Sequence, residues 1–239
     1  MIYRILLLLA ITVFLTNCNF NVKTVKGKGN VIEKTFDFQE FNEVSINIDA
    51  KIQYIQSDEY KVIAKSNSNI IEILKFKLNG NTINLDFKKG YGICCDTKIE
   101  VFVYAPDIEK IEINSSADLI CENNIKSKQL ELIINGNGDI DIKSALINNV
   151  YAEINGNGDI YIKGIGTNVE IEIDGVGDAD FSNYRVKKAY VEINGTGDCK
   201  VLADKSLDIK IDGVGNVFWR GKASVSSKIK GKGSILDEN

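Results

Sequence analysis

The sequence lacks several residues on which catalytic and nucleic-acid-binding proteins rely. Its 239 residues include no histidine, and beyond Arg4 arginine occurs only at Arg185 and Arg220. Lysine and arginine total 29 against 33 acidic residues, with both signs interspersed, and the formal net charge is −4. A nucleic-acid-binding surface needs a concentrated basic face, so we expect no nucleic-acid partner.

Proline is nearly absent, and no apolar run is long enough to span a membrane. Pro106 is the single proline. The longest apolar run, Ile5–Leu15, has eleven residues, whereas a membrane-spanning helix needs about twenty. It follows one positive charge at Arg4, a pattern typical of an export signal.

The end of this segment, Leu15-Thr16-Asn17-Cys18, resembles the lipobox of bacterial lipoproteins, in which the cysteine is diacylated and becomes the mature N-terminus. The resemblance implies a lipoprotein signal peptide over residues 1–17, lipid attachment at Cys18 and an anchor or linker over residues 18–25. Asn19 stands where the commonest inner-membrane retention signal has aspartate. We therefore expect a lipid-anchored protein of the bacterial cell envelope, at the outer membrane, on its periplasmic or its surface side. The alternative is a plain secretory signal with an incidental cysteine.

Glycine is abundant, and much of it belongs to one short phrase that returns six times between Leu130 and Ile235. The phrase begins as Ile-Asn-Gly-Asn-Gly-Asp-Ile and varies from copy to copy. Its first glycines are spaced by 20, 19, 20, 18 and 18 residues: Gly136, Gly156, Gly175, Gly195, Gly213 and Gly231. A fixed period near twenty indicates a repeat architecture.

Apolar and polar residues alternate before and after each glycine pair, as in Val169-Glu-Ile-Glu-Ile173. This alternation predicts strands with one buried face, so each unit is a strand, a sharp corner, a second strand and a looser return. Asn-Gly between two such runs is also a hairpin signal, so a sandwich or roll of antiparallel hairpins is the alternative fold. The same residue types recur at equivalent positions of successive repeats, which favours parallel stacking of equivalent strands. We predict an all-β fold, a right-handed parallel β-helix with coils of about 18–20 residues, and expect the glycines to supply positive φ at the corners.

The N-terminal half continues the β pattern less regularly, and we divide the chain into an irregular β region over residues 26–110 and the repeats over residues 111–239. Residues 111–119 resemble a decayed repeat. A short helical turn is predicted within residues 68–74. The predicted strands of the irregular region are Val44–Ile48, Ile52–Ile55, Tyr60–Ala64, Thr82–Phe87 and Lys98–Tyr104. One solenoid with an irregular first half and two fused β subdomains meeting near Pro106 both fit.

Several separated features now occur in order, and together they resemble the head GIN domain family of auto-transporter adhesins. They are Gly27/Gly29/Val31, then Phe41/Val44, then Val101/Val103/Pro106, then the repeated glycines named above. The resemblance implies an exported, solenoid-like β protein of the cell envelope. It supplies no catalytic residues.

Two ladders of polar side chains flank the repeated glycines. They are Asn135, Asn155, Asp174, Asn194 and Asp212, and Asp139, Asp159, Asp178, Asp198 and Asn216. Such side chains bond turn backbone groups or one another, so we expect turn capping. Gly-x-Gly-Asp also resembles the calcium-loading nonapeptide repeat, but the period here is about twice nine. Calcium binding is therefore the alternative, and we predict no metal site.

Cysteine is scarce, and each of the remaining four has an ordinary interpretation. Cys121 and Cys199 align with inward aliphatic positions and are expected to pack in the core. Cys94 and Cys95 are adjacent in a predicted loop, where a vicinal disulfide is conceivable in an oxidising compartment. We favour a structural or incidental pair.

The outward positions suggest binding rather than catalysis. A polysaccharide-cleaving β-helix needs unlike groups that converge in a cleft, whereas this chain repeats like residues and has no inserted loops. We predict no catalytic residue and no cofactor, with a polysaccharide-active enzyme as the alternative. The outward aromatic residues, which offer a surface for an unknown glycan or envelope protein, are Tyr151, Tyr161, Tyr190 and Phe218.

Overall fold

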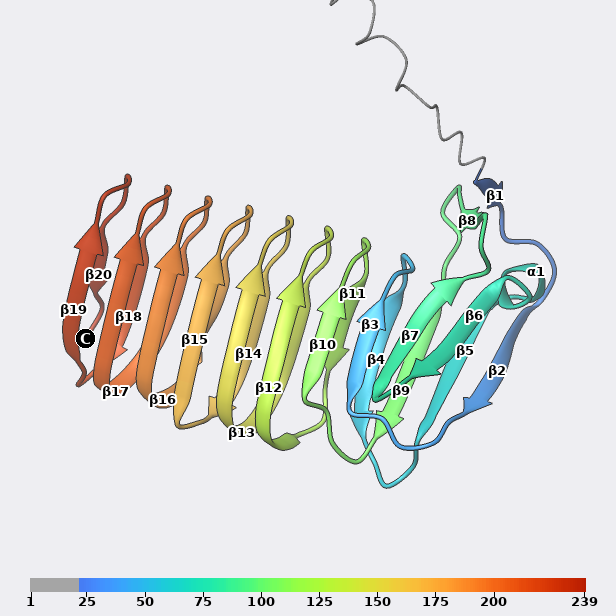
Figure 1. Ribbon diagram of the computed structural model, residues 1–239, viewed down its shortest axis with the longest axis horizontal. Coiled ribbons are helices and arrows are strands. Elements are labelled where there is room, and N and C mark those ends of the chain that lie inside the picture. The colour runs from blue at the N-terminus through green and yellow to red at the C-terminus, as the bar shows by residue number, and fades with distance from the viewer. Residues whose placement is uncertain (1–21) are drawn as a thin grey trace, which may run out of the picture.

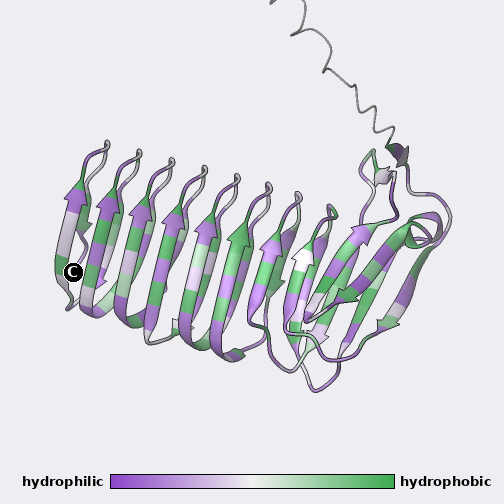
Figure 2. Cartoon of the chain, in the orientation of Figure 1, coloured by the Kyte–Doolittle hydropathy of each residue, from purple (hydrophilic) through white to green (hydrophobic). Residues whose placement is uncertain are grey.

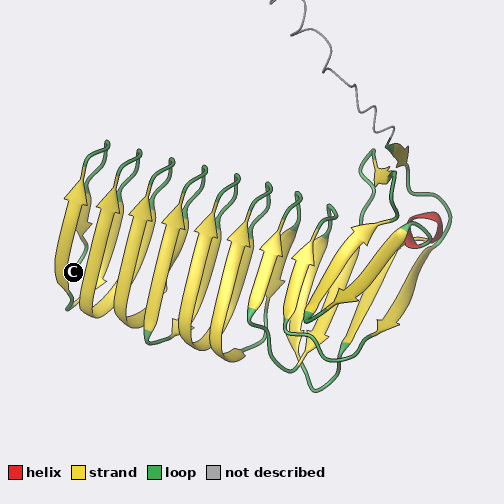
Figure 3. Cartoon of the chain, viewed as in Figure 1, coloured by secondary structure: helices red, strands yellow, loops and turns green. Residues whose placement is uncertain are grey.

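The computed structural model describes residues 22–239, so the signal segment and Cys18 lie outside the described residues. The described chain is built of strands with one helical turn (Figure 3). The first part comprises β1 Lys23–Val25, β2 Val31–Asp37, β3 Glu43–Ile46, β4 Lys51–Gln56, β5 Lys61–Asn67, α1 Ser68–Ile71, β6 Leu74–Asn79, β7 Thr82–Phe87, β8 Tyr91–Ile93 and β9 Glu100–Ala105. The second part comprises β10 Lys110–Ile113, β11 Asp118–Cys121, β12 Ile125–Ile134, β13 Ile140–Ile154, β14 Ile160–Ile165, β15 Asn168–Ile173, β16 Ala179–Ile193, β17 Cys199–Ile211, β18 Val217–Gly221, β19 Ser224–Ile229 and β20 Ile235–Asp237.

Equivalent strands of successive repeats stack in parallel, as predicted, and the hairpin alternative is wrong for the repeats. Ile134 pairs with Ile154, which pairs with Ile173, and the same register continues through the later coils. The chain rises along a front sheet, turns over at the glycine corner and descends along a back sheet (Figure 1). Since it advances from right to left in that view, the coil is right-handed. The β-solenoid prediction is confirmed.

The returns at the lower bend are more regular than expected. β13, β16 and β17 are continuous strands of 15, 15 and 13 residues that run from the back sheet round the bend into the front sheet. Pairing slips at a few places, for example between Phe181 and Arg185. Because neighbouring coils bend together, their backbone groups stay paired round the corner.

Positive φ, the predicted reason, accounts for few of the corner glycines. The first glycine of each corner has no positive φ, and among the second glycines only Gly177 and Gly197 have it, at +159 and +158. A Cβ added at Gly156 would lie 2.0 Å from the carbonyl oxygen of Gly136 in the preceding coil, and one at Gly175 would lie 2.1 Å from that of Gly156. Glycine is needed here because the corners stack backbone on backbone, leaving no room for a side chain.

The irregular region belongs to the same stack. β3 and β4 form a coil that pairs with β10 and β11, although residues 57–109 separate them in sequence. Within that segment β7 and β9 add a further coil beyond β3 and β4. One core and one sheet of 18 strands run across Pro106, so the structure favours a single solenoid over two fused subdomains. The helical turn predicted within residues 68–74 is confirmed as α1.

Antiparallel strands close the N-terminal end of the stack. β6 pairs with β7, β5 with β9 and β2 with β5, all antiparallel. These strands satisfy backbone groups that an open edge would leave unpaired. The sequence pattern did not predict β2 or β6. It also did not predict β1, which lies within the segment expected to be a linker and pairs with β8.

The core is a column of inward aliphatic side chains along the whole stack. Ile134, Ile154, Ile173, Ile193 and Ile211 are each 0% exposed. Figure 2 shows the hydrophobic and hydrophilic bands that alternate along the strands. Cys121 and Cys199 occupy inward positions and are fully buried, as predicted. Residues 22–239 contain no helix that is long and apolar enough to span a membrane.

Candidate functional site: a groove along the front sheet

A groove of about 640 Å³ runs along the solenoid where the front strands begin. It crosses the coils from Glu109 to Asp208. Four aliphatic residues also line it, but their side chains are almost completely buried: Leu130, Val150, Val169 and Ala189. Because every coil places equivalent residues at equivalent positions, the groove has rows of side chains rather than a single centre.

Two rows of outward side chains line the groove. One row consists of the residues that directly follow these aliphatic residues and their equivalents in the sequence, and the other of the residues that directly precede them. The acid–tyrosine row consists of Glu131, Tyr151, Glu170, Tyr190 and Asp208. The amide row consists of Gln129, Asn149, Asn168, Lys188 and Ser206. Acidic and aromatic residues alternate along the first row, while the second is mostly uncharged. Sequence reasoning found the tyrosines but missed the amide row, because its residues precede the regular alternation.

The two tyrosines of the groove are held by glutamates. The Tyr151 hydroxyl donates to Glu172, 3.0 Å between the oxygens, and the Tyr190 hydroxyl donates to Glu192. Burial, and then the bond to Glu172, raise the pKa of Tyr151 above its usual value, while the bond to Glu192 raises the pKa of Tyr190 to about 12. Both rings are therefore neutral and anchored at neutral pH, with their hydroxyls engaged inside the protein.

A third row of outward residues, the glutamate row, lies beside the acid–tyrosine row: Glu153, Glu172, Glu192 and Lys210. Lys210 bonds Glu192 and, with Tyr190, lowers the pKa of Glu192 to about 2. Glu172 has no ion-pair partner among the described residues. Desolvation, and then the neighbouring charges of Glu170 and Glu153, raise its pKa.

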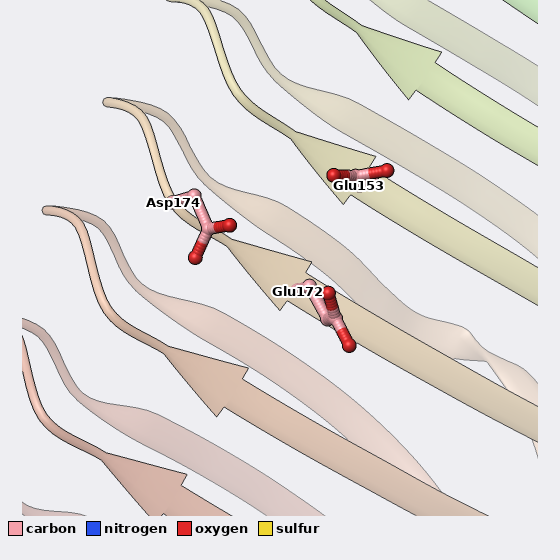
Figure 4. Close-up of side chains that lie close together, drawn as sticks. All are labelled: Glu153, Glu172 and Asp174. Carbon is pink, nitrogen blue, oxygen red and sulfur yellow. The ribbon is translucent and has the colours of Figure 1, made fainter.

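Glu153, Glu172 and Asp174 form the acidic group of residues 22–239 that is close enough to share a cation. One carboxylate oxygen of each lies within 4.8 Å of the others, at the upper ends of two front strands (Figure 4). Each already accepts a hydrogen bond, from Asn155, Tyr151 and Asn194 respectively. These bonds offset part of the mutual repulsion, and the group differs from the Gly-x-Gly-Asp column considered for calcium.

The family model described as "Putative auto-transporter adhesin, head GIN domain" matches residues 40–223. The chain belongs to this family. Among solved structures, one from Bacteroides fragilis, titled a putative adhesin, is similar to this chain. The alignment covers 89% of this chain and 99% of that one, with 23% identity and a TM-score of 0.86. The comparison with curated proteins gave no match.

Two further structures from Parabacteroides distasonis share the fold of this head GIN domain. One is titled a putative adhesin, with 20% identity, a TM-score of 0.71 and coverage of 90% of this chain and 100% of that one. The other is titled a "Putative lipid binding protein", with 20% identity, a TM-score of 0.74 and coverage of 91% and 100%. The family resemblance seen in the sequence is confirmed, and it associates the protein with the cell surface and envelope.

The aspartate column of the head GIN domain caps the corners, as predicted. The backbone amide of Asp159 donates to the carboxylate of Asp139 at 2.8 Å, and that of Asp178 donates to Asp159 at 2.7 Å. The pattern continues up to Asn216, whose side-chain oxygen accepts from the amide of Ser234. Each carboxylate thus ties its coil to the next. The asparagine ladder also forms, for example from Asn155 to Asn135 at 3.0 Å.

The remaining predicted residues do not join the groove. Tyr161 and Phe218 belong to β14 and β18, on the back sheet. Cys94 and Cys95 lie in the loop after β8, and their sulfurs are 2.9 Å apart. The structure therefore brings together Tyr151 and Tyr190 and separates them from the other two aromatic residues.

Proposed function

We propose that this head GIN domain is a non-catalytic binding module of the bacterial cell envelope, held at the outer membrane by a lipid on Cys18. Its groove receives an extended ligand that lies along the solenoid axis and contacts several coils at once. The observation that carries this proposal is the pair of residue rows lining the groove from Glu109 to Asp208. A ligand that contacts every coil adds weak, similar interactions, which suits adhesion.

The same rows argue against catalysis. Polysaccharide hydrolysis needs two carboxyl groups in unlike environments around one bond. The groove instead repeats its acids along one row and offers Lys188 as the single cation of its lining. Incubation with envelope polysaccharides should release no new reducing ends or unsaturated products.

The binding proposal is tested with the mature chain carrying Cys18→Ser, immobilised and exposed to solubilised cell-envelope material. We expect retention of envelope polymer by the unchanged groove, and loss of most of it when Tyr151→Ala and Tyr190→Ala are combined. Tyr161→Ala, on the back sheet, is the matched control and should retain as much as the parent. Equal retention by all three proteins would contradict a role for the groove.

The anchor proposal has a separate test. The wild type should fractionate with membranes and incorporate labelled palmitate, because a diacylglyceryl group supplies the two chains that stable anchoring needs. Cys18→Ser should lose the label without loss of the β fold, since the core lies within residues 22–239. A wild-type protein that is soluble and unlabelled would overturn the lipoprotein interpretation.

A further inference from the structure

We propose that the ligand of the groove is an extended β-linked polysaccharide without acidic groups, whose disaccharide unit spans two coils. This inference rests on the proposed function and names its ligand class. It comes from the order of residues in the acid–tyrosine row, where Tyr151 and Tyr190 are separated by Glu170 alone.

The spacing of the tyrosines matches an alternating sugar chain. Neighbouring parallel strands lie about 4.8 Å apart, so residues two coils apart are about 10 Å apart. In an extended β-1,4-linked chain each sugar is turned over relative to the last. The same face therefore recurs at every second sugar, over a length close to two strand spacings. Tyr151 and Tyr190, two coils apart, therefore meet the same face of two sugars of one chain.

The tyrosine rings are prepared for stacking rather than for hydrogen bonding. Their hydroxyls are already used by Glu172 and Glu192, and both rings are half-buried. A ring fixed in this way pays little conformational entropy on binding and offers its face. Stacking on the apolar faces of sugar rings is the contact that such a surface can make.

The polar residues between the rings suit hydroxyl groups. Side-chain amides donate and accept hydrogen bonds, as hydroxyls do. Asn168 donates to Asn149 at 2.7 Å, and Gln129 donates to Glu109 at 3.2 Å, which fixes these amides along the amide row. Free donors and acceptors then remain on each amide for the ligand.

The charge of the groove excludes an acidic polymer. Its lining holds Glu109, Glu131, Glu170 and Asp208 against Lys188. Lys110, just outside, pairs with Glu131 at 3.1 Å. The remaining carboxylates repel polyanions and accept hydrogen bonds from sugar hydroxyls. A linear polycation satisfies the charge but not the alternation of tyrosines, and it is the competing outcome of the test.

Calorimetric titration of the mature chain carrying Cys18→Ser tests this ligand class. The probes are β-1,4-linked cello- and N-acetylchito-oligosaccharides of two to six sugars, maltohexaose as the α-linked control, oligogalacturonate as the polyanion and hexalysine as the polycation. We expect the β-linked series to bind with an affinity that rises with length and levels off near six sugars, with the three control probes at least about tenfold weaker.

Matched variants assign the contact. Tyr151→Ala or Tyr190→Ala should each weaken β-linked hexasaccharide binding by about tenfold. Tyr151→Phe should retain most of the binding, because the ring face remains although its bond to Glu172 is lost. Tyr161→Ala should bind as the parent does. Circular dichroism of each variant confirms that the fold is retained.

Four results would overturn the inference. Equal binding of maltohexaose, or β-linked binding that ignores both tyrosines, would remove the argument from alternation. Binding of hexalysine alone, lost in Glu170→Gln, would keep the groove as a binding site and replace the ligand class. If no probe binds and envelope material is also retained independently of the groove tyrosines, the proposed function fails as well.

Discussion

The coil formed by β3 and β4 and the repeat coils make the same corner with different residues. The corner between β3 and β4 holds Ile48 and Ala50, both buried, where the repeats have glycine. Ser115 and Ala117 occupy these places in the next coil, and Gly136 and Gly138 in the one after. The corner itself therefore does not require glycine. Glycine becomes necessary when a corner is stacked on a neighbour of the same shape.

The two regions also differ in how they end and balance their strands. The irregular region closes its end with antiparallel strands, while the repeat region extends by adding parallel coils. Repetition stacks like residues in several rows, so inward apolar residues reinforce one another and the stacked glutamates Glu153, Glu172 and Glu192 repel one another. Four tests, each with its own control, sharpen this comparison, from the largest expected effect to the smallest.

Removal of one coil in register should leave a folded, shorter solenoid. Deleting residues 151–169 joins Val150 to Glu170, and Val150 pairs with Val169 in the intact stack. The inward and outward sides of all later strands are therefore preserved. We expect a strand-rich circular dichroism spectrum and one cooperative melting transition at a somewhat lower temperature.

Deleting one residue more, 151–170, is the matched control. It joins Val150 to Ile171 and exchanges the two faces at the junction, which turns Glu172 toward the core. We expect loss of cooperative melting. Equal spectra and melting temperatures for the two deletions would contradict the stacked-coil register.

The second test asks whether stacking or backbone conformation makes the repeat glycines necessary. Gly175→Ala places a Cβ 2.1 Å from the carbonyl oxygen of Gly156, and we expect a loss of about 3 kcal/mol because backbone must move. Gly90→Ala in the irregular region is the control. Gly90 has φ +82 and nothing within 4 Å of an added Cβ, so only the left-handed conformation opposes alanine, at about 1 kcal/mol. Denaturant unfolding measures both, and a larger loss at Gly90 would refute the stacking argument.

The third test concerns the aspartate column, which does not extend into the irregular region, because Lys51 is in register with Asp118. That region makes one similar bond two residues earlier, where Asp49 accepts from the amide of Ser116 at 2.9 Å. Asp159→Ala leaves the amide of Asp178 without its acceptor and should cost about 1–2 kcal/mol. Asp159→Asn keeps an acceptor, as Asn216 does in its own coil, and should cost much less. Millimolar calcium should leave the melting temperature unchanged. A rise of about ten degrees or more that both Asp159→Asn and Asp178→Asn abolish would instead establish a calcium site.

The repeats made the fold predictable because period and alternation are local properties of the sequence. Spacing of the glycines gave the coil length, and the identity of Ile134, Ile154 and Ile173 gave the parallel register. The recurrence of aspartate after each glycine pair predicted that Asp159 caps its corner. The predicted reason for the glycines was incomplete, since a single sequence does not reveal how closely two coils approach.

The irregular region and the groove were harder to predict for a common reason. The pairing of β3 with β10 joins segments separated by more than sixty residues, and nothing local announces it. The groove depends on how the chain bends below the front sheet, where Asn149 and Asn168 precede the alternating pattern. Tyr151 and Tyr161 looked equivalent in sequence, yet the corner between them places them on opposite sheets.

The smallest expected effect comes from a carboxylate that is partly desolvated within a row of glutamates. Glu172 lies between Glu153 and Glu192 in the glutamate row, and its folded pKa is raised, first by desolvation and then by its acidic neighbours. A carboxyl whose folded pKa exceeds its unfolded value loses stability as pH rises through that interval, and the penalty persists at pH 7. Glu172→Gln should therefore raise the melting temperature at pH 7 by one or two degrees, about 0.5 kcal/mol.

The gain from Glu172→Gln should vanish near pH 4, where the unfolded carboxyl is also protonated. Glu192→Gln is the control of opposite sign. The bond from Lys210, and then that from Tyr190, lower the pKa of Glu192 to about 2, so its stabilisation is complete above its unfolded pKa and is lost as pH falls toward 2. Removing it should lower the melting temperature at pH 7. Thermal melts of both variants between pH 3 and pH 8 test these signs. If both substitutions shift the melting temperature in the same direction at pH 7, the charge of Glu172 is not destabilised by desolvation and its acidic neighbours.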